Sequence, residues 1–331
     1  MSPSTPTGST ASSSTPRPDP VEDSQLGYGD VKEAADRIRG RVRPVAVAGT
    51  GRLRFALEYL QHTGSFKARG AVNFLRSHSD AGTLPAAGVA IASGGNAGLA
   101  CAWAARALDV TATVFLPASA PEVKVDRLRG YGAEVRLIDG EYADAAAACA
   151  RFTEQSGALE SHAYDRPAIA AGAGTLVEEI RAQVPGLDTL VVAVGGGGLF
   201  AGVATAAQHH GLRTVAVEPE NCRALNAALQ AGQPVDVPVD SVAADSLGAR
   251  RATALALHAA QQHNTFSVLV PDRAIVAARR TLWDDRRIVV ELGAATALAA
   301  LTTGAYVPDP DETVAVVLCG ANTDPSDLVR P

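Results

Sequence analysis

Short apolar runs alternate along the chain with longer, alanine-rich segments. Such runs are typical of buried strands, and the alanine-rich segments are long enough for helices. We expect strands over residues 88–92, 111–116, 134–137, 189–194, 214–217, 267–270 and 313–318. We expect helices over residues 31–40, 97–108, 142–156, 172–183, 199–210, 271–285 and 294–303. Strands that alternate with such helices form βαβ units, so the fold class is α/β, with open, mostly parallel sheets covered on both faces.

The composition excludes several classes of protein. A length of 331 residues suggests two domains at roughly 150 residues each. The chain is 47% hydrophobic and 19% charged, which is enough apolar material for a sizeable core. A net charge of −6 argues against nucleic-acid binding. No apolar run approaches the roughly 18 residues of a membrane span. We therefore expect neither nucleic acid nor a membrane as a partner.

Two further features bear on the setting of the protein. Fifteen of the first twenty residues are Ser, Thr or Pro, so we expect residues 1–25 to form a disordered tail without the apolar core of a secretory signal. The cysteines are far apart and lack the spacing of metal ligands; they are Cys101, Cys149, Cys222 and Cys319. We expect free thiols and a cytoplasmic protein.

The first candidate for chemistry is a run of four glycines between a predicted strand and a predicted helix. Ligands of open α/β sheets bind beyond the carboxyl ends of the strands. Glycines allow close backbone approach, and a helix N-terminus offers unpaired N–H groups, so this loop predicts a phosphate site. The run consists of Gly195, Gly196, Gly197 and Gly198, and Leu199 follows it. The same loop fits a dinucleotide fingerprint, with Glu218 at the ribose position, so an NAD-dependent dehydrogenase is an alternative.

Two other junctions carry polar residues. The turn at Thr63-Gly64-Ser65 places Lys67 in the first turn of a helix, where the positive end of the dipole lowers a lysine pKa. Such a lysine suits Schiff-base chemistry, although a solvated lysine is an alternative. At the loop that begins with Ser93, the side chain of Asn96 and the nearby N–H groups can hold a carboxylate. A lysine nucleophile, a carboxylate nest and a phosphate cradle together predict pyridoxal 5′-phosphate as cofactor and an amino acid as substrate.

The motifs also match a known family. The run HTGSFKARGA at residues 62–71, the glycine run and the Cys-Gly-Ala-Asn sequence ending at Asn322 occur in the order found in fold-type II, tryptophan synthase β-like pyridoxal-phosphate enzymes. The chain resembles their serine/threonine dehydratases in particular, from about residue 28 to residue 328. The resemblance implies a large domain of residues 26–82 and 163–331, a small inserted domain of residues 83–162, and the cofactor in the cleft between them.

The resemblance also implies residue roles. Lys67 would bind the cofactor covalently and remove the α-proton of the substrate. Phe66 would lie beside the cofactor ring, Asn96 would bind its 3′-oxygen, and Cys319 would face its pyridine nitrogen. The loop from Gly195 to Leu199 would bind the phosphate. The substrate carboxylate would contact Ser65, Ser93, Gly95, Asn96 and Ala97. The segment around Glu291 resembles a family motif, with Leu292 in place of its proline.

The implied activity is the elimination of water from L-serine or L-threonine, which yields pyruvate or 2-oxobutyrate and ammonia. Gly94 stands where relatives that racemise carry a second serine, so racemisation is disfavoured. We expect a homodimer, no effector-binding domain and, at Glu218, a possible monovalent cation site. The alternatives are β-elimination or β-replacement on another amino acid, the dehydrogenase above, and a binding protein without activity.

Overall fold

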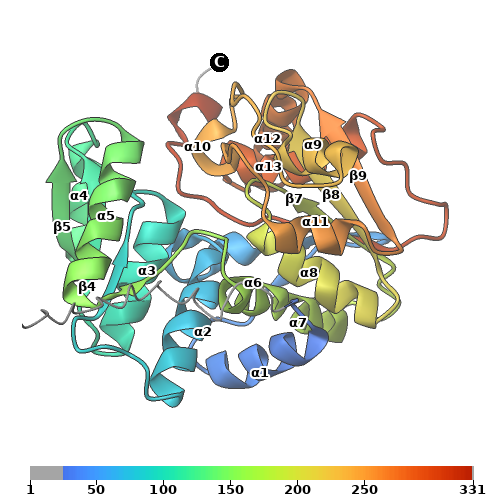
Figure 1. Cartoon of the computed structure of the whole chain (residues 1–331). Helices are drawn as coiled ribbons and strands as arrows, with labels where there is room; N and C mark the ends of the chain where they lie inside the picture. The colour runs from blue at the N-terminus through green and yellow to red at the C-terminus, as the bar shows by residue number, and fades with distance from the viewer. Residues whose placement is uncertain (1–24, 330–331) are drawn as a thin grey trace, which may run out of the picture.

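The structure is a computed structural model that describes residues 25–329. Of the tail predicted at residues 1–25, only the last residue lies within this range. The described chain forms two sheets, each with helices packed against it (Figure 1). No helix among residues 25–329 is both long enough and apolar enough to cross a membrane.

The larger sheet has six strands in the order β1-β2-β10-β7-β8-β9. Neighbouring strands run parallel except β1, which pairs antiparallel with β2 at one edge. Strands β7 and β10 are buried along their whole length, as expected for apolar runs covered on both faces. The strands are β1 (Val47–Ala48), β2 (Leu53–Ala56), β7 (Thr189–Ala193), β8 (Arg213–Pro219), β9 (Thr265–Val270) and β10 (Val314–Val317).

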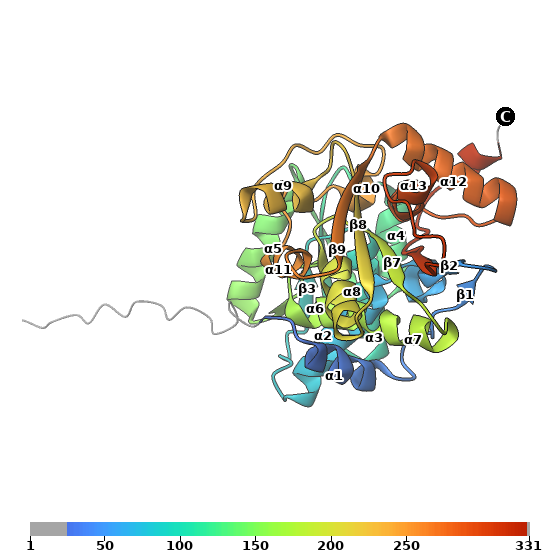
Figure 2. The ribbon, with the colours of Figure 1, turned by 90° about the vertical axis from the view of Figure 1, so that its right-hand side faces the viewer.

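Helices cover both faces of this sheet (Figure 1 and Figure 2). The alanine-rich helices α8 and α13 contact its central strands and are almost wholly buried, because small side chains allow close packing. The helices around this sheet are α1 (Tyr28–Ile38), α2 (Lys67–Asp80), α6 (Pro167–Gly174), α7 (Leu176–Gln183), α8 (Gly198–His209), α9 (Ala224–Ala231), α10 (Ala244–Leu247), α11 (Ala254–Ala260), α12 (Asp272–Arg286) and α13 (Leu292–Thr302). We call this sheet and these helices the large unit.

The smaller sheet has four parallel strands in the order β5-β4-β3-β6. Alternate residues of β3 face opposite sides, as the period of a strand requires: Val89 and Ile91 pack with α3, and Ala90 packs with α5. The elements are β3 (Val89–Ile91), α3 (Asn96–Ala107), β4 (Ala112–Pro117), α4 (Glu122–Gly130), β5 (Glu134–Ile138), α5 (Tyr142–Ser156) and β6 (Leu159–Glu160). We call them the small unit. They all lie within residues 83–162, where the inserted domain is predicted.

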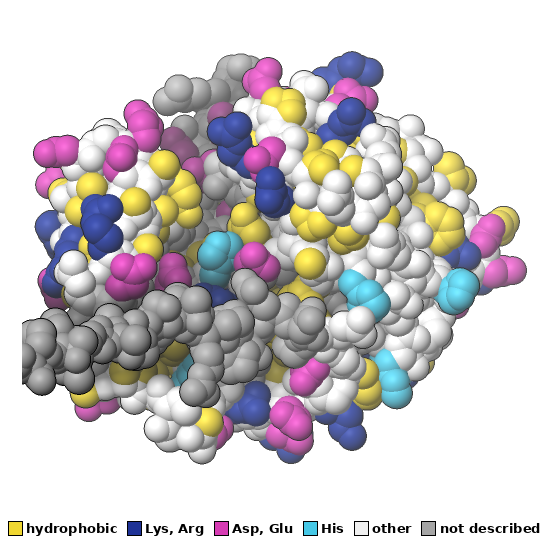
Figure 3. Space-filling model, in the orientation of Figure 1, with side chains coloured by type: hydrophobic (Ala, Val, Ile, Leu, Met, Phe, Trp, Pro, Cys, Tyr) yellow, Lys and Arg dark blue, Asp and Glu magenta, His cyan; other side chains and the backbone are white. Residues whose placement is uncertain are grey.

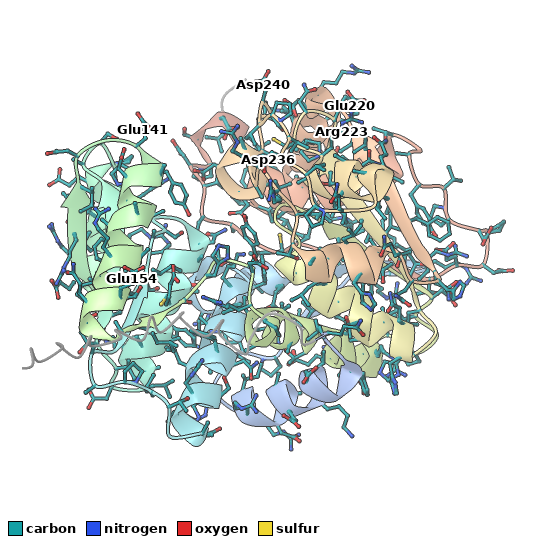
Figure 4. The ribbon with its side chains drawn as sticks, in the orientation of Figure 1. Glu141, Glu154, Glu220, Arg223, Asp236 and Asp240 are labelled. Atoms are coloured by element: carbon teal, nitrogen blue, oxygen red, sulfur yellow. The ribbon has the colours of Figure 1, made fainter. Side chains whose placement is uncertain are left out.

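The structure confirms the α/β class and corrects the predicted elements in detail. Each predicted strand is present within two or three residues of its predicted bounds. The predicted helix at 172–183 is instead two helices, α6 and α7, which meet at Thr175. Strands β1, β2 and β6 were not predicted, because their runs are too short or too polar to stand out, and neither were α4 and α9–α11. Exposed charges such as Glu141, Glu154 and Glu220 stand on the outside of the molecule (Figure 4).

A buried ion cluster holds the start of α2. The guanidinium of Arg69, which is 0% exposed, donates to Glu58 at 2.6 and 3.1 Å and to Glu179 at 2.8 Å through each of two nitrogens. It also donates to Thr175 Oγ1 at 3.1 Å. The cluster joins α2 to the segment before it and to α7. Lys67 lies two residues before Arg69, so the cluster also fixes the lysine.

We predict that Arg69→Met destabilises the protein by about 3–5 kcal/mol, because Glu58 then remains buried without its charged partner. The double variant Arg69→Met/Glu58→Gln, which removes the stranded charge as well, should recover a part of that loss. Urea unfolding of the unmodified protein and of the two variants measures both the loss and the recovery of the free energy of unfolding. Equal stability of Arg69→Met and the unmodified chain would contradict this account.

Candidate active site

A cleft of about 770 Å³ lies between the two units. The space-filling view shows the surface hollowed between them (Figure 3). The start of α2 and the loops after β3, β7 and β10 form its walls, so the carboxyl ends of strands from both sheets meet there. All the predicted cofactor-binding residues line this cleft; they are Phe66, Lys67, Asn96, Gly195, Gly196, Gly197, Gly198, Leu199 and Cys319.

Lys67 is the first residue of α2, as predicted. Its Nζ donates to the carbonyl oxygen of Ala163 at 2.6 Å and lies 4.6 Å from the centre of the Phe66 ring. Burial lowers the pKa of Lys67 to about 8, although Cys319 and Glu291 oppose that shift. A measurable fraction of this amine is therefore neutral, and nucleophilic, near pH 7.

The glycine run forms a cradle of backbone donors. The N–H groups of Gly195, Gly196 and Gly197 donate to no group among residues 25–329, and α8 begins at Gly198. Gly197 has φ of 99°, and a Cβ there would lie 2.3 Å from the Cβ of Ala256. A Cβ on Gly196 would lie 2.3 Å from the Tyr164 ring. Only glycines fit these two positions, and the free N–H groups suit an anion.

The loop between β3 and α3 forms the facing wall. Ser93, Gly95, Asn96 and Ala97 line the cleft, and α3 begins at Asn96. A Cβ on Gly94 would lie 2.7 Å from a methyl group of Leu116. A side chain at residue 94 therefore requires Leu116 to move, which gives a packing reason for the glycine.

Cys319 lies at the end of β10, and its backbone carbonyl accepts the N–H of Phe66 at 3.0 Å. Burial raises the pKa of the Cys319 thiol far above its usual range, and the neighbouring Glu291 raises it further. The thiol therefore stays protonated. Glu291 is itself buried at 8% exposed, and both of its oxygens accept Asn96 Nδ2 at 3.1 Å.

Two predicted residues lie away from the cleft wall. Ser65 is 0% exposed, and its hydroxyl has no hydrogen-bond partner among the described residues. Its contact with the substrate stays a prediction. Glu218 is also 0% exposed, and its two oxygens accept the N–H groups of Leu225 and Asn226 at 2.7 and 2.8 Å. A carboxylate buried in this way cannot bind a ribose in the cleft, which removes the main support for the dehydrogenase alternative.

The cleft also contains residues for which the sequence predicted no role. Tyr164 lies against the glycine run, and Glu291 and Asn322 lie on the floor. The mouth carries a set of basic side chains with a single aspartate, Asp245; the basic residues are Lys124, Arg127, Arg250 and Arg251. These charges attract anions into the cleft. Tyr164 follows β6, a strand that was not predicted, and the basic residues lie on α4 and after α10, so no sequence signal marked them.

The groups in this cleft fit pyridoxal 5′-phosphate. The lysine, which can be neutral, suits its aldehyde, the free N–H groups suit its phosphate, and the protonated thiol suits its ring nitrogen. No group of three or more His, Cys, Asp or Glu that could hold a metal ion occurs within residues 25–329. The chemistry of the lysine, the N–H groups and the thiol thus fits a cofactor-dependent enzyme.

Comparison with known proteins agrees with this class. The model of the family described as "Pyridoxal-phosphate dependent enzyme" matches residues 44–320. The L-threonine ammonia-lyase of Geobacter sulfurreducens is 36% identical over 309 residues, covering 90% of this chain and 76% of the relative. The human protein named serine dehydratase-like is 37% identical over 279 residues, covering 80% and 83%. The structure of maize serine racemase matches with a TM-score of 0.85 at 28% identity, covering 92% and 96%.

The chain therefore belongs to the family of pyridoxal-phosphate dependent enzymes. These findings confirm the family, the fold and the cofactor expected from the motifs.

We predict that Gly197→Ala weakens cofactor binding at least tenfold, because the added methyl group meets Ala256 and the backbone strain at positive φ costs about 1–3 kcal/mol. Gly29→Ala is the matched control, since a Cβ at this position on α1 meets nothing within 4 Å. Titration of the apoprotein with the cofactor gives both dissociation constants. Equal affinity in the two variants would show that the conformation of the loop does not matter.

Proposed function

We propose that this enzyme removes water from L-serine and L-threonine and releases pyruvate or 2-oxobutyrate with ammonia. The observation that carries the proposal is the cleft itself, in which Lys67, the glycine run and the loop at Ser93 face one another. Relatives named as a threonine ammonia-lyase and as serine dehydratase-like support the same reaction.

Each part of the cleft has one task in this reaction. The N–H groups from Gly195 to Leu199 bind the phosphate, and Phe66 lies beside the ring. The loop from Ser93 to Ala97 and the start of α3 hold the substrate carboxylate, and the family resemblance assigns the buried Ser65 to the same carboxylate. When bound, the cofactor supplies an electron sink that makes the α-proton of the amino acid acidic. The basic mouth of the cleft draws in anions.

Lys67 moves the proton. Its Nζ is the one lysine nitrogen on the cleft floor, and the lowered pKa lets it accept the α-proton near neutral pH. The hydroxyl on the β-carbon takes up the proton that Lys67 removed and leaves as water, which gives the carbon–carbon double bond. The released enamine then hydrolyses to the 2-oxo acid and ammonia. Cys319 would face the ring nitrogen of the bound cofactor with a neutral thiol, because burial raises the pKa of that thiol. A neutral partner leaves more of the negative charge at the α-carbon, which favours prompt loss of the β-hydroxyl.

A second candidate activity is racemisation, which the similarity to maize serine racemase brings forward. Racemisation needs an acid or base on each face of the α-carbon. Gly94 offers none, and Leu116 fills the space where a side chain at residue 94 would stand. We therefore place elimination before racemisation. Elimination or replacement on another β-substituted amino acid uses the same residues and remains an alternative.

We predict that Lys67→Ala lowers kcat for L-serine and L-threonine at least about 10³-fold, because it removes both the nucleophile and the base. The chain has three lysines, Lys32, Lys67 and Lys124. Borohydride reduction of the loaded enzyme followed by peptide mass spectrometry should place the cofactor on Lys67. Lys32→Ala, on the exposed side of α1, is the control and should match the unmodified enzyme. Cofactor attached to another lysine would refute this assignment.

The lowered pKa of Lys67 predicts a pH dependence. Only the neutral amine attacks an aldehyde, and its fraction rises about tenfold per pH unit below the pKa and levels off above it. The rate at which the apoprotein takes up the cofactor covalently should therefore rise up to about pH 8 and then become flat. Stopped-flow absorbance measures it. A rate that still rises tenfold per unit between pH 9 and 10 would indicate an ordinary lysine.

There are three finer proposals. The homodimer and a monovalent cation at Glu218 rest on the family resemblance, and the cytoplasmic setting rests on the widely spaced cysteines. Glu218 already accepts two N–H groups, so a cation there needs backbone carbonyls to complete its shell. Activity in potassium chloride compared with tetramethylammonium chloride tests the cation. Equal activity in the two salts would refute it.

A further inference from the structure

A chain of four polar side chains runs from Arg127 at the mouth of the cleft to Glu291 on its floor and passes between the units three times. Arg127 Nη2, on α4 of the small unit, donates to Asn322 Oδ1 of the large unit at 2.6 Å. Asn322 Nδ2 donates to Asn96 Oδ1 of the small unit at 2.6 Å. Asn96 Nδ2 donates to both oxygens of Glu291, in the large unit, at 3.1 Å.

The direction of these hydrogen bonds is fixed at one end. A guanidinium only donates, so the atom of Asn322 that faces Arg127 is its oxygen. Asn322 Nδ2 also donates to the backbone carbonyl of Thr63 at 2.8 Å, and a carbonyl only accepts. Both hydrogens of this amide nitrogen are thereby used, and the second meets Asn96 Oδ1. The NH₂ group of Asn96 is therefore turned away from Asn322, toward Glu291 and the cleft.

Two glycines border this chain of side chains. A Cβ on Gly64 would lie 3.0 Å from Asn322 Oδ1, and a Cβ on Gly320 would lie 2.4 Å from a Glu291 oxygen. Two glycines thus make the space in which Asn322 and Glu291 sit. Asn96 is also the first residue of α3, so the amide stands at the N-terminal end of that helix.

We propose that Asn322 is a positioning residue that holds the amide of Asn96 with its NH₂ group toward the cofactor. Arg127 fixes the orientation of Asn322, and it does so only when the small unit is seated against the large unit. The orientation of Asn96 is thereby coupled to the closure of the cleft. The inference rests on the proposed role of Asn96 as the donor to the 3′-oxygen of the cofactor.

The variant Asn322→Asp tests the orientation. The substitution keeps the size of the side chain and its bond from Arg127, but it replaces the donor by an acceptor that faces Thr63 and Asn96. Asn96 then either turns its amide over, which sets its oxygen against Glu291, or keeps Nδ2 on Glu291 and faces the new carboxylate with Oδ1; both arrangements disturb the donor at the cleft. We expect the dissociation constant of the cofactor to rise at least tenfold, with a shifted absorption band of the bound cofactor and a changed pH dependence of that band.

Variants at Arg127 test the coupling without a buried substitution, because this side chain is exposed. Arg127→Met should weaken cofactor binding two- to tenfold and shift the band in the same direction. Arg127→Lys keeps a donor and should restore most of the loss. Arg129→Met is the matched control. Arg129 lies on the same helix, forms its ion pair with Asp126 at 3.8 Å and does not line the cleft. This variant should therefore behave as the unmodified protein.

Thermal unfolding of each apoprotein reports whether the variant folds. If Asn322→Asp does not fold, the Arg127 variants alone test the proposal. Unchanged affinity and band position in Asn322→Asp, or equal effects of Arg127→Met and Arg129→Met, would overturn the proposal. Assay of the unmodified enzyme with L-serine and L-threonine keeps the two hypotheses apart. Absence of oxo acid there defeats the proposed reaction, whereas the variant spectra judge Asn322 alone.

Discussion

The position of the first turn of α2 is the constraint on which the site depends. A lysine must be held at the positive end of a helix, largely out of water, although its charged form is unfavourable there. The fold secures it from three sides. Arg69 is held by Glu58 and Glu179. The N–H of Phe66 donates to the carbonyl of Cys319, just after β10. Helix α2 crosses α6 where Gly70 and Gly172 leave no space for a Cβ. The reactivity of Lys67 thus follows from packing that extends well beyond the cleft.

Around that lysine, the parallel sheets bring together groups that are far apart in the sequence. The ends of β3, β7 and β10 provide a carboxylate nest, a cradle of free N–H groups and a protonated thiol. None of these groups carries a full charge. The cleft therefore binds anions with backbone dipoles, whereas the charged side chains of Lys124 and of the arginines lie at its mouth, where water still screens them.

Much of the fold and of the candidate site could be predicted from the sequence. Hydrophobic periodicity and the residue types at strand-to-helix junctions are local properties of the chain. The strands, the glycine run, Lys67 and Asn96 all follow from residues close together in the chain. The break at Thr175 could not be foreseen, because the apolar pattern continues through it and the contact of Thr175 with Arg69 comes from a distant part of the chain. Tyr164, Glu291 and the bond between Arg127 and Asn322 depend on how the two units sit together, which no local pattern encodes.

The most direct test is the absorbance spectrum of the purified, cofactor-loaded enzyme before and after addition of L-serine or L-threonine, with 2-oxo acid measured in the same sample. The account predicts a cofactor band that shifts on addition of the amino acid, together with steady formation of pyruvate or 2-oxobutyrate. A band that shifts without any oxo acid would contradict the elimination. A protein that shows no band after incubation with pyridoxal 5′-phosphate would contradict the site itself.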